Sequence, residues 1–568
     1  MSIIGYMETK RKTRILLVAE FSLLNTGFSV MNYEMLKRLH ESDEFEVAEF
    51  ASYIGDDDPR INEVPWKVYP VIPSTSKKQE TALYQEKYRT AQFGELRFED
   101  TVLDFKPDIV FSYRDYWHDE YITRSPYRNL FYYMWSVCVD SEPPHPEWLS
   151  TYETVDLLTS YTDWGLNVLK NYGSNNLNIA DHNTMPGIDL EMFSPKNKSD
   201  IRGAFGLKDN LNIILSVMRN QPRKLFPDLI RGFMETVDGL YRDGKKELAD
   251  NTYLYLHTGN PDVGFDIVEE IKKYNASHRV LLTYLCDSCN FVFPSFVRGE
   301  MCHCPQCGNL SCHNPNTNSG VTREQLANIY ACSDLYVQVS TAGALEIPII
   351  EAKASGLPTI AVDYAAPFEL NRMGGAFGKI KVLGFKQEGV RETGQFRAVP
   401  DIEHFSKLLR KYLLLNKEGK EEWSTKARKA AEKHHGADLT ADKWIKLFKN
   451  VSVLPEDRWY KTPDPIVVDP SKIPYNANDS IFVRFCYENF LPNKHQAKTF
   501  YQEKKILKGL SLTYTVIDGA GVAPTNRESI INGFSEITNK YNHFQEHRYN
   551  ILVLQKNVVG PEIPFKVL

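Results

Sequence analysis

The chain has 568 residues, of which 42% are hydrophobic and 25% charged, so it is long enough for three or four domains with large cores and is not globally disordered. Its net charge of −6 gives no general attraction to nucleic acid or anionic membranes, although a local basic patch is not excluded. No apolar run is long enough to cross a bilayer, and residues 1–14 lack the hydrophobic region of a secretory signal, so we expect a cytoplasmic protein with no transmembrane segment.

The first third of the chain alternates strands with helices. A largely apolar run at 13–19 is followed by a glycine-containing loop and an amphipathic helix over 30–40. Four further strands are predicted at 45–50, 106–112, 130–136 and 157–160. This alternation predicts a doubly wound α/β domain that binds ligands at the carboxyl ends of its strands. Gly27, in the first loop, either lets the backbone approach such a ligand or forms an ordinary turn.

A second α/β domain follows a predicted linker at 185–195. It starts with a strand at 212–217, and further strands are predicted at 253–257, 279–282, 335–339 and 359–363. Helices over 402–415 and 421–433 close it. The sequence therefore predicts an N-terminal Rossmann-like domain over 1–195 and a second one over 196–450.

Six of the nine cysteines fall between residues 286 and 312, and this clustering favours a metal site over scattered disulfides. Two Cys-x2-Cys pairs have the spacing of a zinc ribbon, and they are Cys286, Cys289, Cys304 and Cys307. An alternative ligand set, or part of a second site, consists of Cys302, Cys312, His303 and His313. Four thiolates leave no open coordination position, so Zn²⁺ is expected to be structural, in an insert over 284–320 and in a reducing compartment.

Residues 341–363 predict a loop, a helix, a turn and a buried strand. Gly343 permits close approach of the backbone to a ligand, and Pro348 suits the first turn of a helix. A loop that leads into a helix N-terminus presents free N–H groups and a positive dipole end, which suit a phosphate. Glu351, about one turn inside this helix, can reach ribose hydroxyls.

This order of residues resembles the donor-binding segment of GT-B glycosyltransferases, family 4 in particular. Glu351-Ala352 and the run from Ser355 to Pro358 match the family phrase, whereas Gly343 stands at the place of its first Glu. Glu346 replaces a family glycine, and we expect it to supply the acidic contact to the donor sugar from a shifted loop. The resemblance implies a donor site that includes Gly27, Gly343, Ala344, Leu345 and Glu351.

Arg219 and Lys224 follow the first strand of the second domain. Family 4 enzymes have Arg and Lys at this spacing, and the resemblance implies that both contact the donor diphosphate and support catalysis. Two cations there would neutralise the charge that grows on a departing diphosphate. The alternative is a pair of solvated loop cations.

Polar residues follow strand ends of the first domain, where an acceptor hydroxyl would meet the donor. They are Asp115, His118, Asp140, Glu142 and His145. Of these, Asp115 and His118 are the catalytic candidates, although any one such carboxylate is more often a cap or a surface group than a base. The resemblance implies a retaining reaction in which the departing phosphate takes the acceptor proton, so that no dedicated protein base is required.

The composition changes after residue 450. A stretch at 454–474 is rich in Pro and Asp, which is typical of a linker, and strands are predicted at 481–485, 512–517 and 549–554. We predict an α+β extension over 451–568, with no role assigned.

The sequence thus predicts an α/β protein with two Rossmann-like domains (GT-B), an inserted zinc ribbon and a C-terminal α+β extension. The predicted activity is that of a retaining glycosyltransferase without a catalytic metal, which moves a sugar from a nucleoside diphosphate sugar to an acceptor hydroxyl, with a saccharide as the expected acceptor. Three alternatives remain at this point. They are glycosylation of hydroxymethylated bases in phage DNA, in the host cytoplasm; an inactive GT-B scaffold that acts as a zinc-dependent binding module; and a sugar-nucleotide epimerase.

Overall fold

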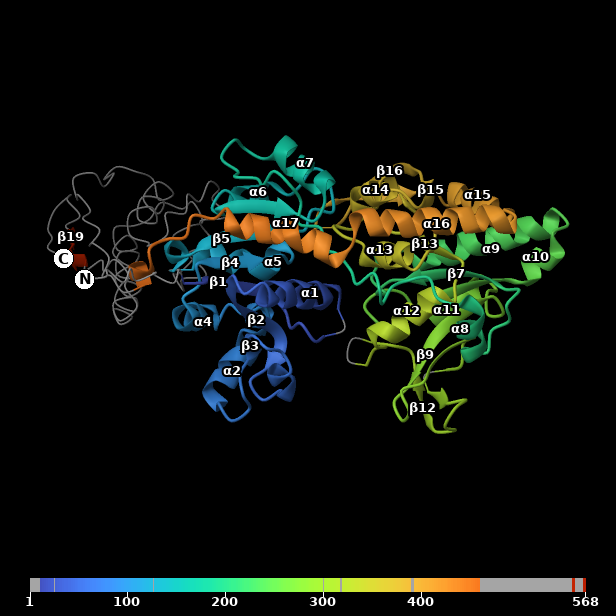
Figure 1. The fold of residues 1–568 in the computed structure, drawn as a ribbon, viewed down its shortest axis with the longest axis horizontal. Coiled ribbons are helices and arrows are strands. Elements are labelled where there is room, and N and C mark those ends of the chain that lie inside the picture. Colours follow the sequence, from blue (N-terminus) through green and yellow to red (C-terminus); the bar gives the residue numbers. More distant parts are fainter. Residues whose placement is uncertain are drawn as a thin grey trace, which may run out of the picture.

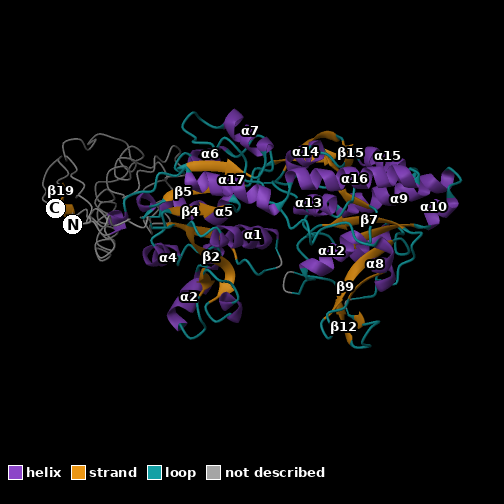
Figure 2. Cartoon of the chain, in the orientation of Figure 1, coloured by secondary structure: helices purple, strands orange, loops and turns teal. Residues whose placement is uncertain are grey.

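The computed structural model describes most of the chain up to residue 459 as two α/β lobes that lie side by side (Figure 1). The described residues are 11–24, 26–125, 127–299, 301–316, 319–389, 393–459, 554–556 and 565–567. Each lobe contains one central sheet with helices on both faces, as the colouring by secondary structure shows (Figure 2).

The first sheet is six-stranded and parallel, with the order β3-β2-β1-β4-β5-β6. Its strands are β1 (Thr13–Glu20), β2 (Phe45–Gly55), β3 (Lys67–Ile72), β4 (Ile109–Ser112), β5 (Tyr132–Val137) and β6 (Leu157–Ser160). The helices around it include α1 (Gly27–Glu41), α4 (Phe98–Phe105), α5 (Tyr116–Asp119), α6 (Pro146–Tyr152) and α7 (Asp163–Tyr172). The strand order reverses between β1 and β4, and such a switch point is where doubly wound folds bind ligands. All five strands predicted in this part of the chain are confirmed, and β3 is an addition.

The second sheet repeats this topology and adds antiparallel strands at one edge. Its parallel part has the order β9-β8-β7-β13-β14-β15. These strands are β7 (Asn212–Val217), β8 (Thr252–His257), β9 (Val280–Cys286), β13 (Leu335–Gln338), β14 (Thr359–Val362) and β15 (Ala376–Ile380). The helices include α9 (Phe226–Arg242), α12 (Arg323–Ala331), α13 (Ile347–Ala354), α14 (Ala365–Arg372), α15 (Ile402–Leu413) and α16 (Lys417–His434). The prediction of two Rossmann-like domains is therefore confirmed.

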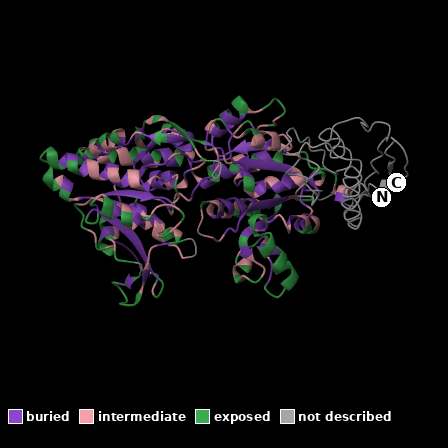
Figure 3. Ribbon diagram, turned by 180° about the vertical axis from the view of Figure 1, so that it is seen from behind, coloured by how far each residue is buried: buried purple, intermediate pink, exposed green. Residues whose placement is uncertain are grey.

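Apolar side chains on both faces explain why the two sheets are buried. In β7, Ile213 and Leu215 pack into one cluster of apolar side chains, while Ile214 packs into another on the opposite face. The strands of both lobes are accordingly buried over most of their length (Figure 3). Burial on both faces is expected of parallel strands with crossover helices.

The cysteine-rich insert extends the β9 edge of the second sheet. Three short strands belong to it, namely β10 (Val292–Ser295), β11 (Cys302–His303) and β12 (Leu310–His313). Both β10 and β12 pair with β9 in antiparallel fashion, and β11 pairs with β12. The insert projects away from the body of the second lobe (Figure 1).

The chain crosses between the lobes twice, and the two crossings touch. The linker residue Ile188 exchanges backbone hydrogen bonds of 2.9 and 3.0 Å with His435 and Ala437. The second crossing leads into α17 (Ala437–Lys449), which lies along the first lobe while α16 lies along the second (Figure 1). Trp444 and Phe448 of α17 are buried in the core of the first lobe, so a helix that follows the second sheet in the chain completes the first domain.

Little of the C-terminal region belongs to the described part of the chain. The predicted strands at 481–485 and 512–517 lie outside it, as do residues 549–553 of the third predicted strand and most of the predicted linker at 454–474. Within the described residues, β18 (Leu554–Lys556) pairs with β19 (Phe565–Val567) in antiparallel fashion. Over the same described residues, no helix combines the length and the apolar character needed to span a membrane.

Candidate functional site

The two sheets present their carboxyl ends to a common junction. Helix α1 begins at Gly27 after β1, and α13 begins at Ile347 after β13. A Cβ on Gly27 would lie 3.6 Å from Cδ1 of Ile347, so the two helix starts are close neighbours across the junction. Ala344, Leu345 and Ile347 also pack against the core of the first domain. Two positive helix ends therefore lie at one place, which favours an anion.

A buried ion pair occupies the second-domain side of this junction. Lys224, in the loop after β7, pairs with Oε1 of Glu346, in the loop after β13, and both residues are only 5% and 4% exposed. Burial lowers the pKa of Lys224 to about 8, although the carboxylate of Glu346 opposes this shift. The lysine is thus held near the pH at which it can lose its proton.

Gly343 makes room for the carboxylate of this pair. A Cβ at position 343 would lie 1.9 Å from Oε1 of Glu346, which is an impossible approach. The Glu346 side chain therefore fills the space that a side chain at 343 would need. Glycine at 343 and glutamate at 346 are therefore sterically compatible with each other.

Arg219 lies farther out and is paired differently. Its guanidinium forms hydrogen bonds of 3.1 and 3.2 Å with the Asp262 carboxylate, and its side chain is 52% exposed. Its charge also reaches Glu20 at the end of β1, whose pKa is raised by burial and lowered in part by Arg114 and Arg219. Arg219 thus lies at the junction, and among the described residues its guanidinium is paired with Asp262 rather than with Glu346.

Glu351 is buried inside α13 and is hydrogen-bonded. The Tyr330 hydroxyl donates to its Oε2 at 3.0 Å. Burial raises its pKa, and the nearby Arg323 guanidinium opposes that rise. Arg323 itself lies 3.7 Å from Glu34 of the first domain, so Glu351 belongs to a set of polar groups close to the domain boundary.

On the first-domain side, Asp115 lies at the junction, and His118 follows in the next turn of the chain, with its backbone N–H donated to the Asp115 carbonyl at 2.9 Å. Burial and the repulsion of Asp140 raise the pKa of Asp115 to about 6, while Arg223 lowers it in part. His118 stacks on Phe93 with ring centroids 4.2 Å apart, and burial holds its pKa well below its usual range. Asp115 can therefore hold or release a proton near neutral pH, whereas His118 stays neutral.

A second set of contacts joins the domains beside this site. It links the loop at 140–145 to Tyr364, directly before α14, and to the antiparallel hairpin of β16 (Val382–Gln387) and β17 (Phe396–Pro400). Arg397 pairs with Asp140 at 2.6 Å, and the Tyr364 hydroxyl accepts a hydrogen bond of 3.0 Å from the Glu142 backbone. The predicted acceptor-side loop is thus held by the second domain.

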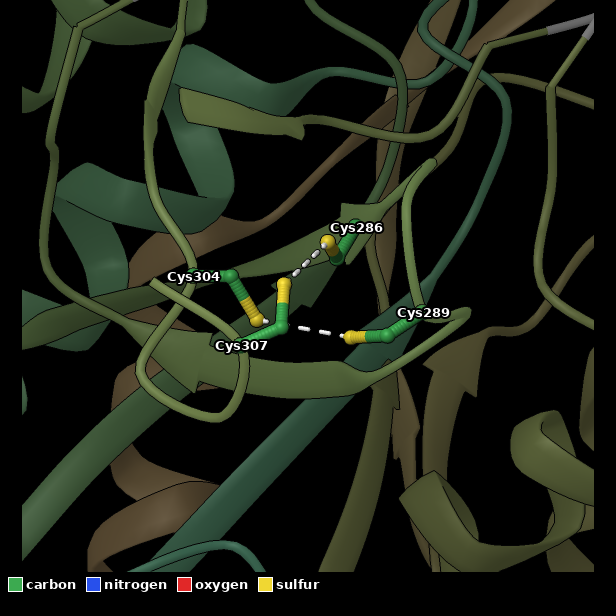
Figure 4. A group of neighbouring side chains, drawn as sticks. All are labelled: Cys286, Cys289, Cys304 and Cys307. Atoms are coloured by element: carbon green, nitrogen blue, oxygen red, sulfur yellow. Dashed lines mark hydrogen bonds between the residues drawn. The ribbon is translucent and has the colours of Figure 1, made fainter. Parts of the chain in front are cut away.

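Four cysteines of the insert form a compact group (Figure 4). They are Cys286, Cys289, Cys304 and Cys307, whose sulfurs all lie within 4.8 Å of one another. The Sγ atoms of Cys286 and Cys307 are 3.7 Å apart, and those of Cys289 and Cys304 are 3.6 Å apart. A tetrahedral ion with metal–sulfur bonds of about 2.3 Å requires sulfurs about 3.8 Å apart. The geometry therefore fits one tetrahedral metal ion.

The local backbone explains how the insert forms this group. Asn290 and Gly308, the residues directly after each Cys-x2-Cys pair, have positive φ values of 57° and 78°. Each turn is closed by a hydrogen bond, from Asn290 N to the Cys286 carbonyl at 2.8 Å and from Gly308 N to the Cys304 carbonyl at 2.9 Å. The side chains of the alternative ligands lie beside this group but are not part of it. Cys302 and Cys312 are buried in the same apolar cluster as Cys286 and Cys304, and Cys312 lies opposite Cys286 across the paired strands. His303 contacts the Gly308 carbonyl, and His313 contacts Asp287.

Two residues that sequence reasoning did not select also lie at the junction. Arg223 directly precedes Lys224, and Thr341 begins the loop that contains Gly343. The sequence contains a signal for Arg223, because it is a third basic residue in the run from Arg219 to Lys224. Nothing in the sequence distinguishes Thr341.

Comparison with known proteins identifies the fold. No protein-family model matches the chain, and no curated protein matches it by sequence. Among solved structures, sucrose-phosphate synthase from Thermosynechococcus elongatus matches with a TM-score of 0.51 at 16% identity, over 77% of this chain and 98% of that one. A glycosyltransferase from Rickettsia africae matches with a TM-score of 0.52 at 14% identity, over 77% and 98%. The Anabaena protein HepE, solved in complex with UDP and glucose, matches with a TM-score of 0.52 at 13% identity, over 77% and 100%. The chain thus has the GT-B fold of two Rossmann-like domains, as the sequence predicted.

Proposed function

We propose that the protein is a retaining glycosyltransferase of the family 4 type, which transfers a sugar from a nucleoside diphosphate sugar to an acceptor hydroxyl. The observation that carries this proposal is the buried Lys224–Glu346 pair beside the start of α13, at the carboxyl ends of β7 and β13. A GT-B fold alone does not define an activity, so the assignment rests on the chemistry of this site. Complexes such as that of HepE with UDP and glucose agree with a nucleotide-sugar donor.

The proposed roles follow from position and charge. Lys224 and the N–H groups at the start of α13 hold the diphosphate, and Arg219 adds a second positive charge at the exposed side of the site. Glu346 holds hydroxyls of the donor sugar, while the backbone of Gly27, Gly343, Ala344 and Leu345 lines the site. Glu351 binds the ribose through the carboxylate that Tyr330 orients.

The reaction requires the departing phosphate to take the acceptor proton. Asp115 has a pKa near 6 and lies on the acceptor side, so it assists by holding the acceptor hydroxyl rather than by acting as a strong base. His118 is stacked and neutral, and we assign it a supporting position in the turn after Asp115. A saccharide is the acceptor we propose.

We propose that the cysteine group binds Zn²⁺ and that the ion is structural. The four thiolates would complete its coordination and leave no position for substrate. Reduced cysteines of this kind persist in a reducing compartment, which favours the cytoplasm.

The decisive experiment measures the thermal stability of the full chain with UDP-, GDP- and ADP-sugars. A donor at 100 times its Kd stabilises the folded protein by about 2.7 kcal/mol. We expect one base to raise the melting temperature, and Lys224→Ala to abolish that rise and transfer activity. The matched control is Arg231→Ala, because Arg231 pairs with Asp228 and Glu235 on the surface of α9. If none of the sugar nucleotides stabilises the wild-type protein, the proposal is wrong.

Two alternative functions remain testable predictions. Release of free sugar from the donor in the absence of acceptor would exclude an inactive binding module. Binding to duplex DNA that weakens steeply with salt would favour a modified base in DNA over a saccharide, because phosphate contacts release counterions.

A further inference from the structure

One cation at the domain junction forms no ion pair with any of the described residues. Arg219 pairs with Asp262, Lys224 with Glu346, and Arg397 with Asp140 and Glu388. Within the described residues, by contrast, the Arg223 side chain forms no hydrogen bond or ion pair, and its Nη1 is buried. A buried donor without a partner is unfavourable, because it loses its hydrogen bonds to water and gains none.

A second unpartnered polar atom lies on the segment that is bonded to Arg223. Thr341 donates its backbone N–H to the Arg223 carbonyl at 2.9 Å and accepts from the Ala398 N–H at 2.9 Å. Its main chain is thus fixed from both sides. Its hydroxyl oxygen is buried and has no hydrogen-bond partner within the described residues. Two orphaned polar groups, a guanidinium nitrogen and a hydroxyl, therefore belong to neighbouring loops at the ends of β7 and β13.

The charges around Arg223 place it between the two sides of the site. Burial lowers the pKa of Lys224, and the positive charge of Arg223 lowers it further. The same charge lowers the pKa of Asp115, against the larger upward effect of burial. Arg223 therefore lies near the second-domain lysine and also near the first-domain carboxyl group. An anion bound there would offset the repulsion between the two adjacent cations.

We propose that Arg223 and Thr341 form a further phosphate-binding position beside Lys224. A guanidinium and a hydroxyl both donate hydrogen bonds, and the planar guanidinium can bind two oxygens of one phosphate. The position deepens the proposed function and rests on it for the source of the phosphate. That source is either the donor diphosphate or a phosphate group on the acceptor.

Calorimetric titration of the full-length protein distinguishes these sources. The probes are UDP, GDP and ADP, each compared with its nucleoside, and inorganic phosphate titrated onto protein saturated with the diphosphate. The variants are Arg223→Gln, Arg223→Lys, Thr341→Val and Thr341→Ser, with Arg231→Gln as the matched control. Thermal unfolding without ligand shows whether each variant is folded.

If the position binds a phosphate of the donor, Arg223→Gln should weaken diphosphate binding about tenfold to a hundredfold and leave nucleoside binding unchanged. Thr341→Val should weaken it about twofold to tenfold, whereas Thr341→Ser and Arg223→Lys should restore part of the affinity. If the position binds a phosphate of the acceptor, Arg223→Gln should bind the diphosphate as the wild type does. The variant saturated with diphosphate should then no longer bind inorganic phosphate. Either result supports the position.

The proposal is overturned if Arg223→Gln binds both the diphosphate and inorganic phosphate as the wild type does. This outcome leaves the glycosyltransferase assignment standing. If the wild type binds no diphosphate but binds inorganic phosphate through Arg223, the phosphate position stands and the proposed function fails. If the wild type binds neither, both are wrong.

Discussion

At the scale of single residues, the site depends on a lysine that is buried with one carboxylate. Breaking a buried ion pair by removing one partner leaves an uncompensated charge and is strongly destabilising. Lys224 and Glu346 are therefore coupled, and variants of either residue require a separate measurement of folding. Conservative changes are more informative here than alanine.

The first prediction concerns pH. With its pKa lowered to about 8, Lys224 loses its charge as the pH rises through that value, so affinity for a nucleoside diphosphate should fall by up to about tenfold per pH unit above it. Lys224→Arg keeps the charge and should remove this fall, even if it binds more weakly overall. Dissociation constants between about pH 6.5 and 9.5 test this. An equal decline in both proteins would assign the titration to another group.

The second prediction concerns Gly343. Gly343→Ala places a methyl group where Oε1 of Glu346 lies, so the carboxylate must move away from Lys224. We expect diphosphate affinity and transfer to fall about tenfold or more, with the fold retained. Gly203→Ala in α8 (Lys198–Ala204) is the control, because an added Cβ there meets no atom within 4 Å. Unchanged activity of Gly343→Ala would contradict the steric role.

At the scale of elements, we expect the stability of the insert to depend strongly on a metal bound by its four cysteines. Its strands β11 and β12 are short, and short strands with little apolar surface are stabilised by bound metal in many small domains. The apolar clusters on the two faces of the second sheet consist mainly of residues outside the insert, which adds Val292, Phe293, Cys302 and Cys312 to them.

The third prediction concerns the cysteines. We expect about one zinc ion per chain by elemental analysis, and Cys289→Ser should lose it and expose the insert to proteolysis. Cys302→Ala is the matched control, because Cys302 is buried outside the four-sulfur group and should leave the zinc content unchanged. Zinc retained by Cys289→Ser and lost by Cys302→Ala would reverse the ligand assignment.

At the scale of the whole molecule, helix α17 follows the second domain in the chain but packs into the core of the first. Phe448 packs edge-on against Phe45 and Phe111 of the first sheet, at ring distances of 6.2 and 5.3 Å. Trp444 is buried beside them and donates its indole N–H to the Thr184 carbonyl at 3.2 Å. The first domain is therefore complete only after the chain has passed through the second.

The fourth prediction follows from this crossing. Trp444→Ala should destabilise the first domain by about 3–5 kcal/mol, the range for removing a large buried aromatic side chain. Hydrogen exchange should increase in β1 and β4 and stay unchanged in β7 and β13. Trp423→Ala on α16, where Trp423 packs against Phe377, should change the second domain instead. Increased exchange confined to the second domain in Trp444→Ala would contradict this packing.

Strand positions were predictable because buried parallel strands are continuous apolar runs. The runs at 157–160 and 212–217 coincide with β6 and β7. The strand β3 was missed because it is an edge strand with mostly half-buried residues, and its pattern is weak. The helix α17, at 437–449, is missing from the sequence prediction. A local pattern does not show which sheet a helix covers.

Residue order alone accounts for the local features: the apolar strands, the two Cys-x2-Cys turns, and the run from Arg219 to Lys224. These depend on residues that are neighbours in the chain. The tertiary structure is needed to show that Glu346 fills the space at Gly343, that α17 completes the first domain, and that the buried Nη1 of Arg223 has no hydrogen-bond partner among the described residues. Each of these depends on which distant segments meet, and that is set by the packing of two sheets and their crossings rather than by any local pattern.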